Sequence, residues 1–212
     1  MNKKTIDLNT YARKDHFLHF LNMVNPYAGV TVNVDVKPLY DYCRKNNHSF
    51  YLAFVHAVAL AANRVPQLRQ RIHDGSIVEY DTCGTSHIEL LDDETYCYCN
   101  LMHDMDWEEY FPYAEKQRRL SREANSIVDE DVEGLYFISA LPWVHYSELL
   151  QPYDGKESNP RISWGKYEKT GDKMMMPVSI MVHHSLADGL HIGRFYKYLE
   201  EEINRFFKEN CI

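Results

Sequence analysis

Residues Met181–Gly193 read MVHHSLADGLHIG and join the end of an expected strand to the start of an expected helix. The apolar run Met174–Val182 precedes the two histidines, and Asp188-Gly189 supplies a turn signal before a final amphipathic pattern. Neighbouring strand residues point to opposite faces, so only one of His183 and His184 can enter a cleft. A strand end is a rigid platform, which suits a general base. This stretch therefore predicts a strand–turn–helix unit that presents one imidazole for acid–base chemistry.

The same residues also allow a structural or metal-binding role. His183, His184 and His191 lie close together in the sequence, but the His-Glu-x-x-His spacing is absent and zinc would need ligands from elsewhere. Asp188 is embedded in the tight turn, where an unpaired buried carboxylate is costly, so it requires a cation.

Working outward, Arg161–Tyr167 and Met174–Val182 flank Thr170-Gly171-Asp172 and predict a β-hairpin. The alternating run Val30–Val36 predicts a half-buried strand, and Ser49 is an expected N-cap for a helix that ends near Pro66. Further helices are expected at 15–23, 38–47, 106–125 (interrupted near Pro112) and after 189, and further strands at 77–80, 87–91, 95–101 and 135–140. No repeat or linker divides these segments, so we expect a single domain over residues 1–212.

Composition narrows the function classes. The chain has 212 residues, 45% of them hydrophobic, and a formal charge of −8, which disfavours a nucleic-acid partner because no basic excess is present to neutralise phosphates. The N-terminus lacks an apolar signal core and no apolar run is long enough to span a bilayer, so we expect no membrane association and a cytoplasmic protein. The acidic run Glu89–Glu94 is expected to be a solvated loop.

The five cysteines do not have the spacing of a disulfide framework or a zinc site. Cys97 and Cys99 alternate on an expected strand and so lie on one face, where we expect buried, reduced thiols and no metal.

Several blocks, in order over nearly the whole chain, resemble the chloramphenicol acetyltransferase family, one of the acyl-CoA-dependent acyltransferases that share a His-His-x-x-x-Asp-Gly signature. The blocks are Arg13–Phe17, Ser49–Tyr51, Pro66–Arg69, Ser139–Val144, Gly165–Tyr167, Gly171–Lys173 and His183–Gly193. The resemblance implies an α/β fold: a two-layer sandwich in which a mixed, mostly antiparallel β-sheet has helices packed on one face. It also implies a homotrimer in which the histidine of one subunit faces a substrate pocket on its neighbour.

The resemblance further implies a role for each matching residue. His184 matches the general base that deprotonates the acceptor hydroxyl, which then attacks acetyl-CoA directly. Ser139 matches the donor to the tetrahedral oxyanion, and Ser163 stands where the family usually has threonine, holding a water near the same intermediate. Asp188 and Arg13 match a buried ion pair that supports the histidine loop.

For acetyl-CoA, the resemblance implies that Tyr51, Lys166 and Tyr167 line the coenzyme side. Lys166, with Arg161 and Lys173, offers local positive charge for phosphate, although a solvated lysine fits Lys166 equally well.

For the acceptor, Phe20 and Tyr27 are the expected binding residues, Phe20 standing where the family has tyrosine and Tyr27 near a usual phenylalanine. The implied activity is transfer of acetyl to a hydroxyl of chloramphenicol or a similar small molecule. The alternatives are a same-fold acetyltransferase with another small hydroxyl acceptor, a catalytically silent trimeric binding protein, and a lipoyl-domain acyltransferase, which the absence of a preceding lipoyl domain disfavours.

Overall fold

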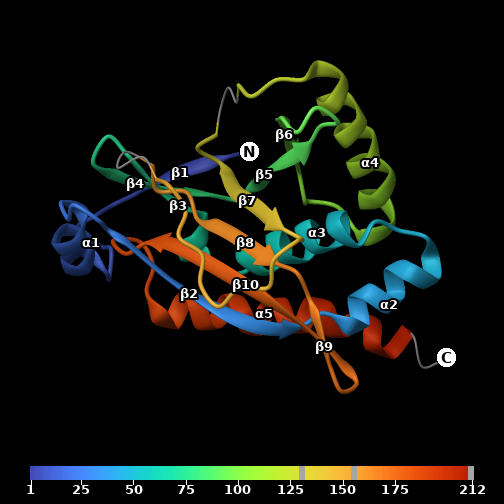
Figure 1. Ribbon diagram of the computed structural model, residues 1–212. Helices are drawn as coiled ribbons and strands as arrows, with labels where there is room; N and C mark the ends of the chain where they lie inside the picture. The colour runs from blue at the N-terminus through green and yellow to red at the C-terminus, as the bar shows by residue number, and fades with distance from the viewer. Residues whose placement is uncertain (129–131, 154–156, 210–212) are drawn as a thin grey trace.

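The computed structural model describes residues 1–128, 132–153 and 157–209, and it is built on one large mixed sheet (Figure 1). Its strands run in the order β2 (Tyr27–Asp35), β10 (Lys173–His183), β8 (Arg161–Gly165), β7 (Leu135–Leu141), β5 (Gly84–Leu90) and β6 (Tyr96–Leu101). The short β9 (Glu168–Thr170) pairs with β10 off this path. Among the strands that the structure describes in this sheet, only the β5–β7 and β7–β8 pairs are parallel, so the expected mixed, mostly antiparallel sheet is confirmed.

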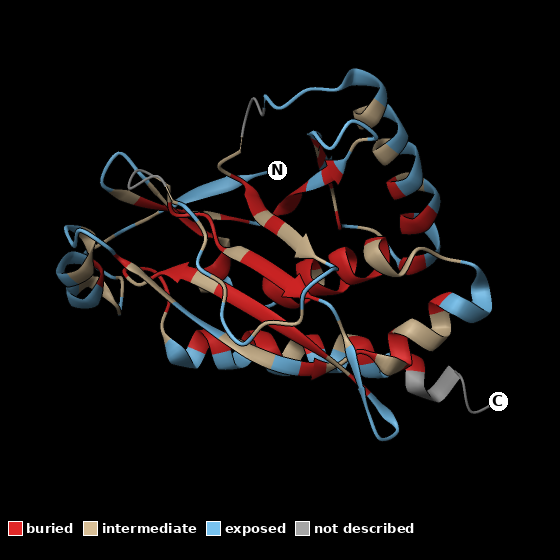
Figure 2. Cartoon of the chain, in the orientation of Figure 1, coloured by how far each residue is buried: buried red, intermediate tan, exposed pale blue. Residues whose placement is uncertain are grey.

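Helices cover one face of this sheet, as expected. The chain adds α1 (Lys14–Leu21), α2 (Lys37–Asn46), α3 (Phe50–Asn63), α4 (Trp107–Ala124) and α5 (Gly189–Glu209). Figure 1 shows α3 and α5 behind the sheet, α4 beside β5 and β6, and α1 apart at one end of β2. The main core lies between the sheet and helices α2 to α5, and Figure 2 shows the buried residues concentrated there.

Local sequence explains why these helices begin where they do. The Ser49 hydroxyl accepts from the Leu52 N–H, which confirms it as the cap of α3, and the Asp106 side chain caps α4 in the same way. Helix α4 is not interrupted at Pro112, contrary to expectation. The cost of one proline near its start is offset by the burial of Trp107, Tyr110, Phe111 and Ala114.

A second, three-stranded sheet consists of β1 (Lys3–Ile6), β4 (Ser76–Tyr80) and β3 (Gln70–His73). Strand β4 matches the strand expected at 77–80, whereas β1, β3 and their pairing into a separate sheet were not predicted. Strand β3 contains the buried polar side chains of Gln70 and Arg71 and so has no apolar alternation. Arg71 donates to the carbonyl oxygens of Leu68, Gln70, Glu133 and Leu135, which stabilises the strand without an apolar face.

Two other expectations are revised. The hairpin turn at Gly171-Asp172 joins β9 to β10, while β8 lies beside a later part of β10. Glu89 does not belong to a solvated loop: it lies on β5, is 2% exposed, and pairs with Arg118 Nε at 2.7 Å.

The four described cysteines are buried and free, as expected, and Cys211 lies outside the described residues. No helix in the described ranges has both the length and the apolar character needed to cross a membrane.

Candidate active site

His184 is the first residue after β10, and its ring is fixed from two sides. Its Nδ1 lies 3.1 Å from the Ala187 carbonyl oxygen, and its ring stacks on Phe20 of α1 with the centroids 3.9 Å apart. A carbonyl can only accept, so Nδ1 carries the proton and Nε2 keeps its lone pair. The backbone N–H of His184 also donates to the Pro26 carbonyl at 2.7 Å. The half-buried imidazole is therefore oriented with its basic nitrogen free to accept a proton.

His183 differs from its neighbour. Its side chain is buried edge-on to Tyr27, and burial together with the charge of His184 lowers its pKa to about 4. The two rings thus have different surroundings: His183 contacts a β2 residue, and His184 contacts α1.

Asp188 and Arg13 form the expected ion pair, with Arg13 Nη1 donating to Asp188 Oδ2 at 2.5 Å. Burial by itself would raise the pKa of Asp188, but the hydrogen bond from Arg13 and the charges of His191 and Arg13 bring it below its usual value. Asp188 Oδ1 also accepts from the Leu190 N–H, so the same carboxylate caps α5. The pair thereby joins α1 and α5 to the turn at residues 184–188 (the histidine turn).

Ser139 and Ser163 are brought side by side by strand register. Ser139 on β7 pairs with Ser163 on β8. Ser163 in turn pairs with Ser179 on β10, and Ser179 pairs with Thr31 on β2. The Thr31 and Ser179 hydroxyl oxygens are 2.6 Å apart, and Ser179 also donates to Tyr146 Oη at 3.4 Å. Side chains at paired positions share a face. Four hydroxyls therefore cross the sheet in one row, on the face away from the main core.

A pocket of about 930 Å³ lies on this same face, and Ser139 is one of its lining residues. Its floor comes from β5, β6 and β7 and its wall from the segment around Tyr153. The remaining described lining residues are Ser86, His87, Ile88, Tyr96, Tyr98, Val132, Phe137, Ile138, Gln151, Pro152, Glu157 and Arg161. His184 is not among them, so this pocket of the described chain contains Ser139, the expected oxyanion donor, but not His184, the expected base.

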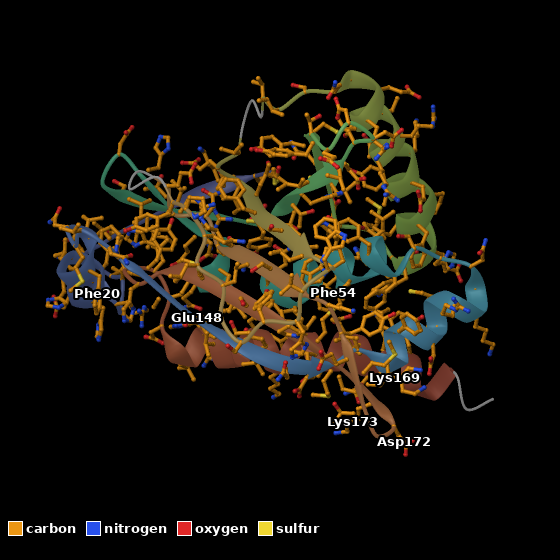
Figure 3. The ribbon with its side chains drawn as sticks, viewed as in Figure 1. Phe20, Phe54, Glu148, Lys169, Asp172 and Lys173 are labelled. Atoms are coloured by element: carbon orange, nitrogen blue, oxygen red, sulfur yellow. The ribbon has the colours of Figure 1, made fainter. Side chains whose placement is uncertain are left out.

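The three residues expected on the coenzyme side are not among the described lining residues of this pocket. Tyr51 and Tyr167 are half-buried, while Lys166 is exposed. The Tyr167 ring packs on Tyr40, 5.4 Å between centroids, and Tyr51 Oη donates to the Ile88 carbonyl at 3.4 Å. Figure 3 places Lys173 near the tip of the β9–β10 hairpin, at the opposite end of the molecule from Phe20.

The two predicted acceptor residues occupy different positions. Phe20 stacks directly on His184, and its ring also meets that of the adjacent His19 edge-on. Tyr27 Oη donates to the Glu157 carbonyl at 2.7 Å, and its ring contacts Tyr153 of the pocket wall. Burial raises the pKa of Tyr27 to about 12, so its phenol stays protonated and serves as a donor.

Several pocket residues had no signal in the sequence. Tyr153 and Glu157 lie in the loop-like stretch 151–160, and Tyr96 and Tyr98 alternate on β6 with the buried Cys97 and Cys99. The alternation of β6 indicates that the two tyrosines share a face, but only sheet pairing places that face beside Ser139. Arg161, named above as a source of positive charge for phosphate, lines this pocket and forms an ion pair with Glu157.

Comparisons with known proteins identify the family of the chain. A family model described as chloramphenicol acetyltransferase matches residues 1–200. A chloramphenicol acetyltransferase of Klebsiella sp is 28% identical over 207 residues, covering 93% of this chain and 92% of its own. One of Proteus mirabilis is 28% identical, covering 97% and 95%.

Solved structures agree as well. A chloramphenicol acetyltransferase structure superposes with a TM-score of 0.83 at 25% identity, covering 95% of this chain and all of the other. A probable dihydrolipoamide acetyltransferase from Listeria monocytogenes, 17% identical with a TM-score of 0.68, shares the fold. The chain therefore belongs to the chloramphenicol acetyltransferase family and is an acyl-CoA-dependent O-acetyltransferase.

Proposed function

We propose that this chain transfers the acetyl group of acetyl-CoA to a hydroxyl of chloramphenicol or a similar small molecule, with His184 as general base. The observation that carries the proposal is the ring of His184: its Nδ1–H is held by the Ala187 carbonyl, so Nε2 is available to accept the hydroxyl proton. A positioned imidazole contributes roughly 10²–10⁴-fold to such a reaction.

In the proposed reaction the acceptor oxygen loses its proton to Nε2 and attacks the thioester carbonyl carbon. The Ser139 hydroxyl donates to the resulting oxyanion, and Ser163, beside it in register, holds a water near the same centre. Collapse of the tetrahedral intermediate breaks the carbon–sulfur bond. The thiolate leaves with the proton from His184, giving free CoA and the acetate ester. Tyr51, Lys166 and Tyr167 are proposed to line the coenzyme side, and Phe20 and Tyr27 to contribute to the acceptor side.

The active site is proposed to form between subunits of a homotrimer. Its support is that Ser139 lines the pocket of one chain while His184 does not, so a second copy would have to bring its imidazole to the pocket. Closed rings of identical subunits form through such head-to-tail interfaces.

A direct test is an assay of CoA thiol release from acetyl-CoA with chloramphenicol and a panel of small alcohols. Release that depends on chloramphenicol supports the proposal. Release only with another alcohol would favour the same-fold enzyme with a different acceptor, and no release with any would favour a binding protein.

The shared site has its own test, subunit complementation. His184→Ala and Ser139→Ala proteins are unfolded together in equal amounts and refolded. If each site uses His184 of one subunit and Ser139 of the next, the refolded mixture as a whole regains about a quarter of the wild-type sites, since half of the subunits at each of the two positions are intact. If both residues act within one chain, mixing restores nothing.

A further inference from the structure

The peptide bond between Ala187 and Asp188 is hydrogen-bonded to a histidine on each side. Its carbonyl oxygen, from Ala187, accepts from His184 Nδ1 at 3.1 Å. Its N–H, from Asp188, donates to Nδ1 of His191 at 3.0 Å. A peptide unit is planar, so its C=O and N–H point in opposite directions and can only turn together. The orientation of this one plane therefore links the ring of His191 to the ring of the proposed base.

His191 lies in the first turn of α5, three residues after the cap Asp188. The Asp188 carboxylate accepts from the Leu190 N–H at 3.1 Å, and the His191 ring accepts from the Asp188 N–H. This is the reciprocal arrangement of a capping box, in which glutamate or glutamine usually stands at the position of His191. The histidine is 4% exposed, so packing holds its ring against the histidine turn.

Two groups of Asp188 compete for Nδ1 of His191. The Asp188 N–H can only donate to this nitrogen, whereas Asp188 Oδ1, at 2.9 Å, can only accept a proton from it. Burial lowers the pKa of His191; the charge of Asp188 opposes this effect, and the charges of Arg13 and Arg194 add to it.

The hydrogen bonds of Asp188 decide between the two states. Its carboxylate already accepts from Arg13 and Leu190, while its N–H has no other acceptor among the described residues. A backbone N–H without a partner is costly. The ring of His191 is therefore neutral at neutral pH, with its proton on Nε2 and the lone pair of Nδ1 directed at the peptide.

We propose that His191 is a positioning residue for the base. By accepting from the Asp188 N–H, it holds the 187–188 peptide in place, and the carbonyl of that peptide keeps the proton of His184 on Nδ1. An amide whose N–H donates to an acceptor is also polarised, which strengthens its carbonyl as an acceptor and favours the imidazolium that forms during the reaction. This inference rests on the proposed function, in which His184 Nε2 takes the hydroxyl proton.

Loss of this acceptor should affect the chemical step. The Asp188 N–H would be unsatisfied, and the peptide would be free to turn toward another partner. His184 Nδ1 then loses its own partner, and a share of the neutral imidazole carries its proton on Nε2 instead. That tautomer cannot accept a proton from an alcohol at Nε2.

Two substitutions of the same shape separate the hydrogen bond from packing. Asparagine has an oxygen on Cγ in the place of His191 Nδ1, and leucine has a methyl group there. We expect His191→Leu to lower kcat about tenfold, the value of one hydrogen bond, with KM for both substrates within about twofold of wild type. His191→Asn keeps an acceptor for the cap, and its kcat should stay within about threefold of wild type.

Ile192→Ala is the matched control for a weakened α5. Ile192 follows His191 in the same turn, is 6% exposed and packs in the main core. Its replacement should lower the free energy of unfolding but leave kcat at the wild-type value wherever the variant is folded. If His191→Asn or Ile192→Ala lowers kcat as much as His191→Leu, the effect comes from packing and the inference is overturned.

Nitrogen-15 NMR of histidine-labelled protein reads the two tautomers directly, because protonated and unprotonated ring nitrogens differ in chemical shift. The signals of His184 and His191 are assigned by their loss in His184→Ala and His191→Asn. At neutral pH we expect the wild-type protein to carry the proton of His184 on Nδ1 and that of His191 on Nε2. In His191→Leu, the His184 signals should move toward the Nε2–H form.

The wild-type spectrum decides the inference even if His191→Leu does not fold. The inference is overturned if either wild-type ring carries its proton on the other nitrogen, or if His191→Leu leaves the tautomer of His184 unchanged. The spectra need no turnover, so the two proposals fail separately. A wild-type protein that releases no thiol with any acceptor would refute the proposed function, while the spectra would still show whether His191 sets the tautomer of His184.

Discussion

Replacing Asp188 gives the sharpest test of how the histidine turn is held. The carboxylate pairs with Arg13 at 2.5 Å, and the two side chains are 29% and 17% exposed. Exposed pairs contribute about 0–1 kcal/mol, whereas breaking a buried pair costs about 3–5 kcal/mol. For this intermediate exposure we expect Asp188→Asn to lower the free energy of unfolding by about 1–3 kcal/mol.

The helix cap can be separated from the charge. Asparagine at position 188 can still cap α5 by accepting from Leu190, so Asp188→Asn keeps the cap and removes the negative charge that faces Arg13 and His191. Asp188→Ala removes the cap as well and should cost about 1 kcal/mol more. A loss of this size lowers the melting temperature by about 2–4 °C per kcal/mol for a chain of this length.

The assay is urea unfolding of wild type, Arg13→Met, Asp188→Asn and the double variant, at one protein concentration because assembly affects stability. We expect a coupling energy of about 1–3 kcal/mol between the two positions. The pKa of Asp188 lies below its usual value, so the contribution is complete above about pH 4 and is lost as the pH falls through the lower folded pKa.

Activity should decrease together with stability in these variants, since the same turn carries Ala187, which holds His184 Nδ1. A coupling energy below about 0.5 kcal/mol would refute the structural role. Loss of acetyl transfer with an unchanged free energy of unfolding would instead place Asp188 in the chemistry.

Three further predictions concern the base, the oxyanion and the core. His184→Ala should abolish thiol release while circular dichroism and elution volume stay at wild-type values, and an active variant would remove His184 as the base. Ser139→Ala should lower kcat by about 10²–10³-fold with little change in KM for acetyl-CoA, and unchanged turnover would rule out the oxyanion role. His56 Nδ1 lies 2.9 Å from His103 Nδ1 in the core, and burial lowers the pKa of His56 to about 3 and that of His103 well below its usual value. In the unfolded chain both histidines bind a proton below about pH 6.5. The free energy of unfolding should therefore decrease as the pH is lowered, by up to about 1.4 kcal/mol per pH unit for each histidine. His56→Phe should reduce that slope in chemical denaturation, and an unchanged slope would show that His56 does not contribute.

Local sequence determined the elements of this protein wherever a pattern was continuous. The alternation of Val30–Val36, the cap at Ser49 and the strand–turn–helix unit around His184 all predict segments that the structure contains. The family resemblance paired Arg13 with Asp188 across most of the chain, and the ion pair is formed. Such features could be read from sequence because they depend on neighbouring residues or on a motif.

Tertiary structure alone decided which distant side chains meet. The stacking of Phe20 on His184, the row of hydroxyls from Thr31 to Ser139, and the position of Arg161 beside Phe137 all depend on strand register and helix placement. Strand β3 and the buried Glu89 were missed for the same reason, because their polar side chains are satisfied by partners far away in the sequence. Burial and pairing are properties of the whole packed chain, and no local pattern encodes the partner that a buried charge will find.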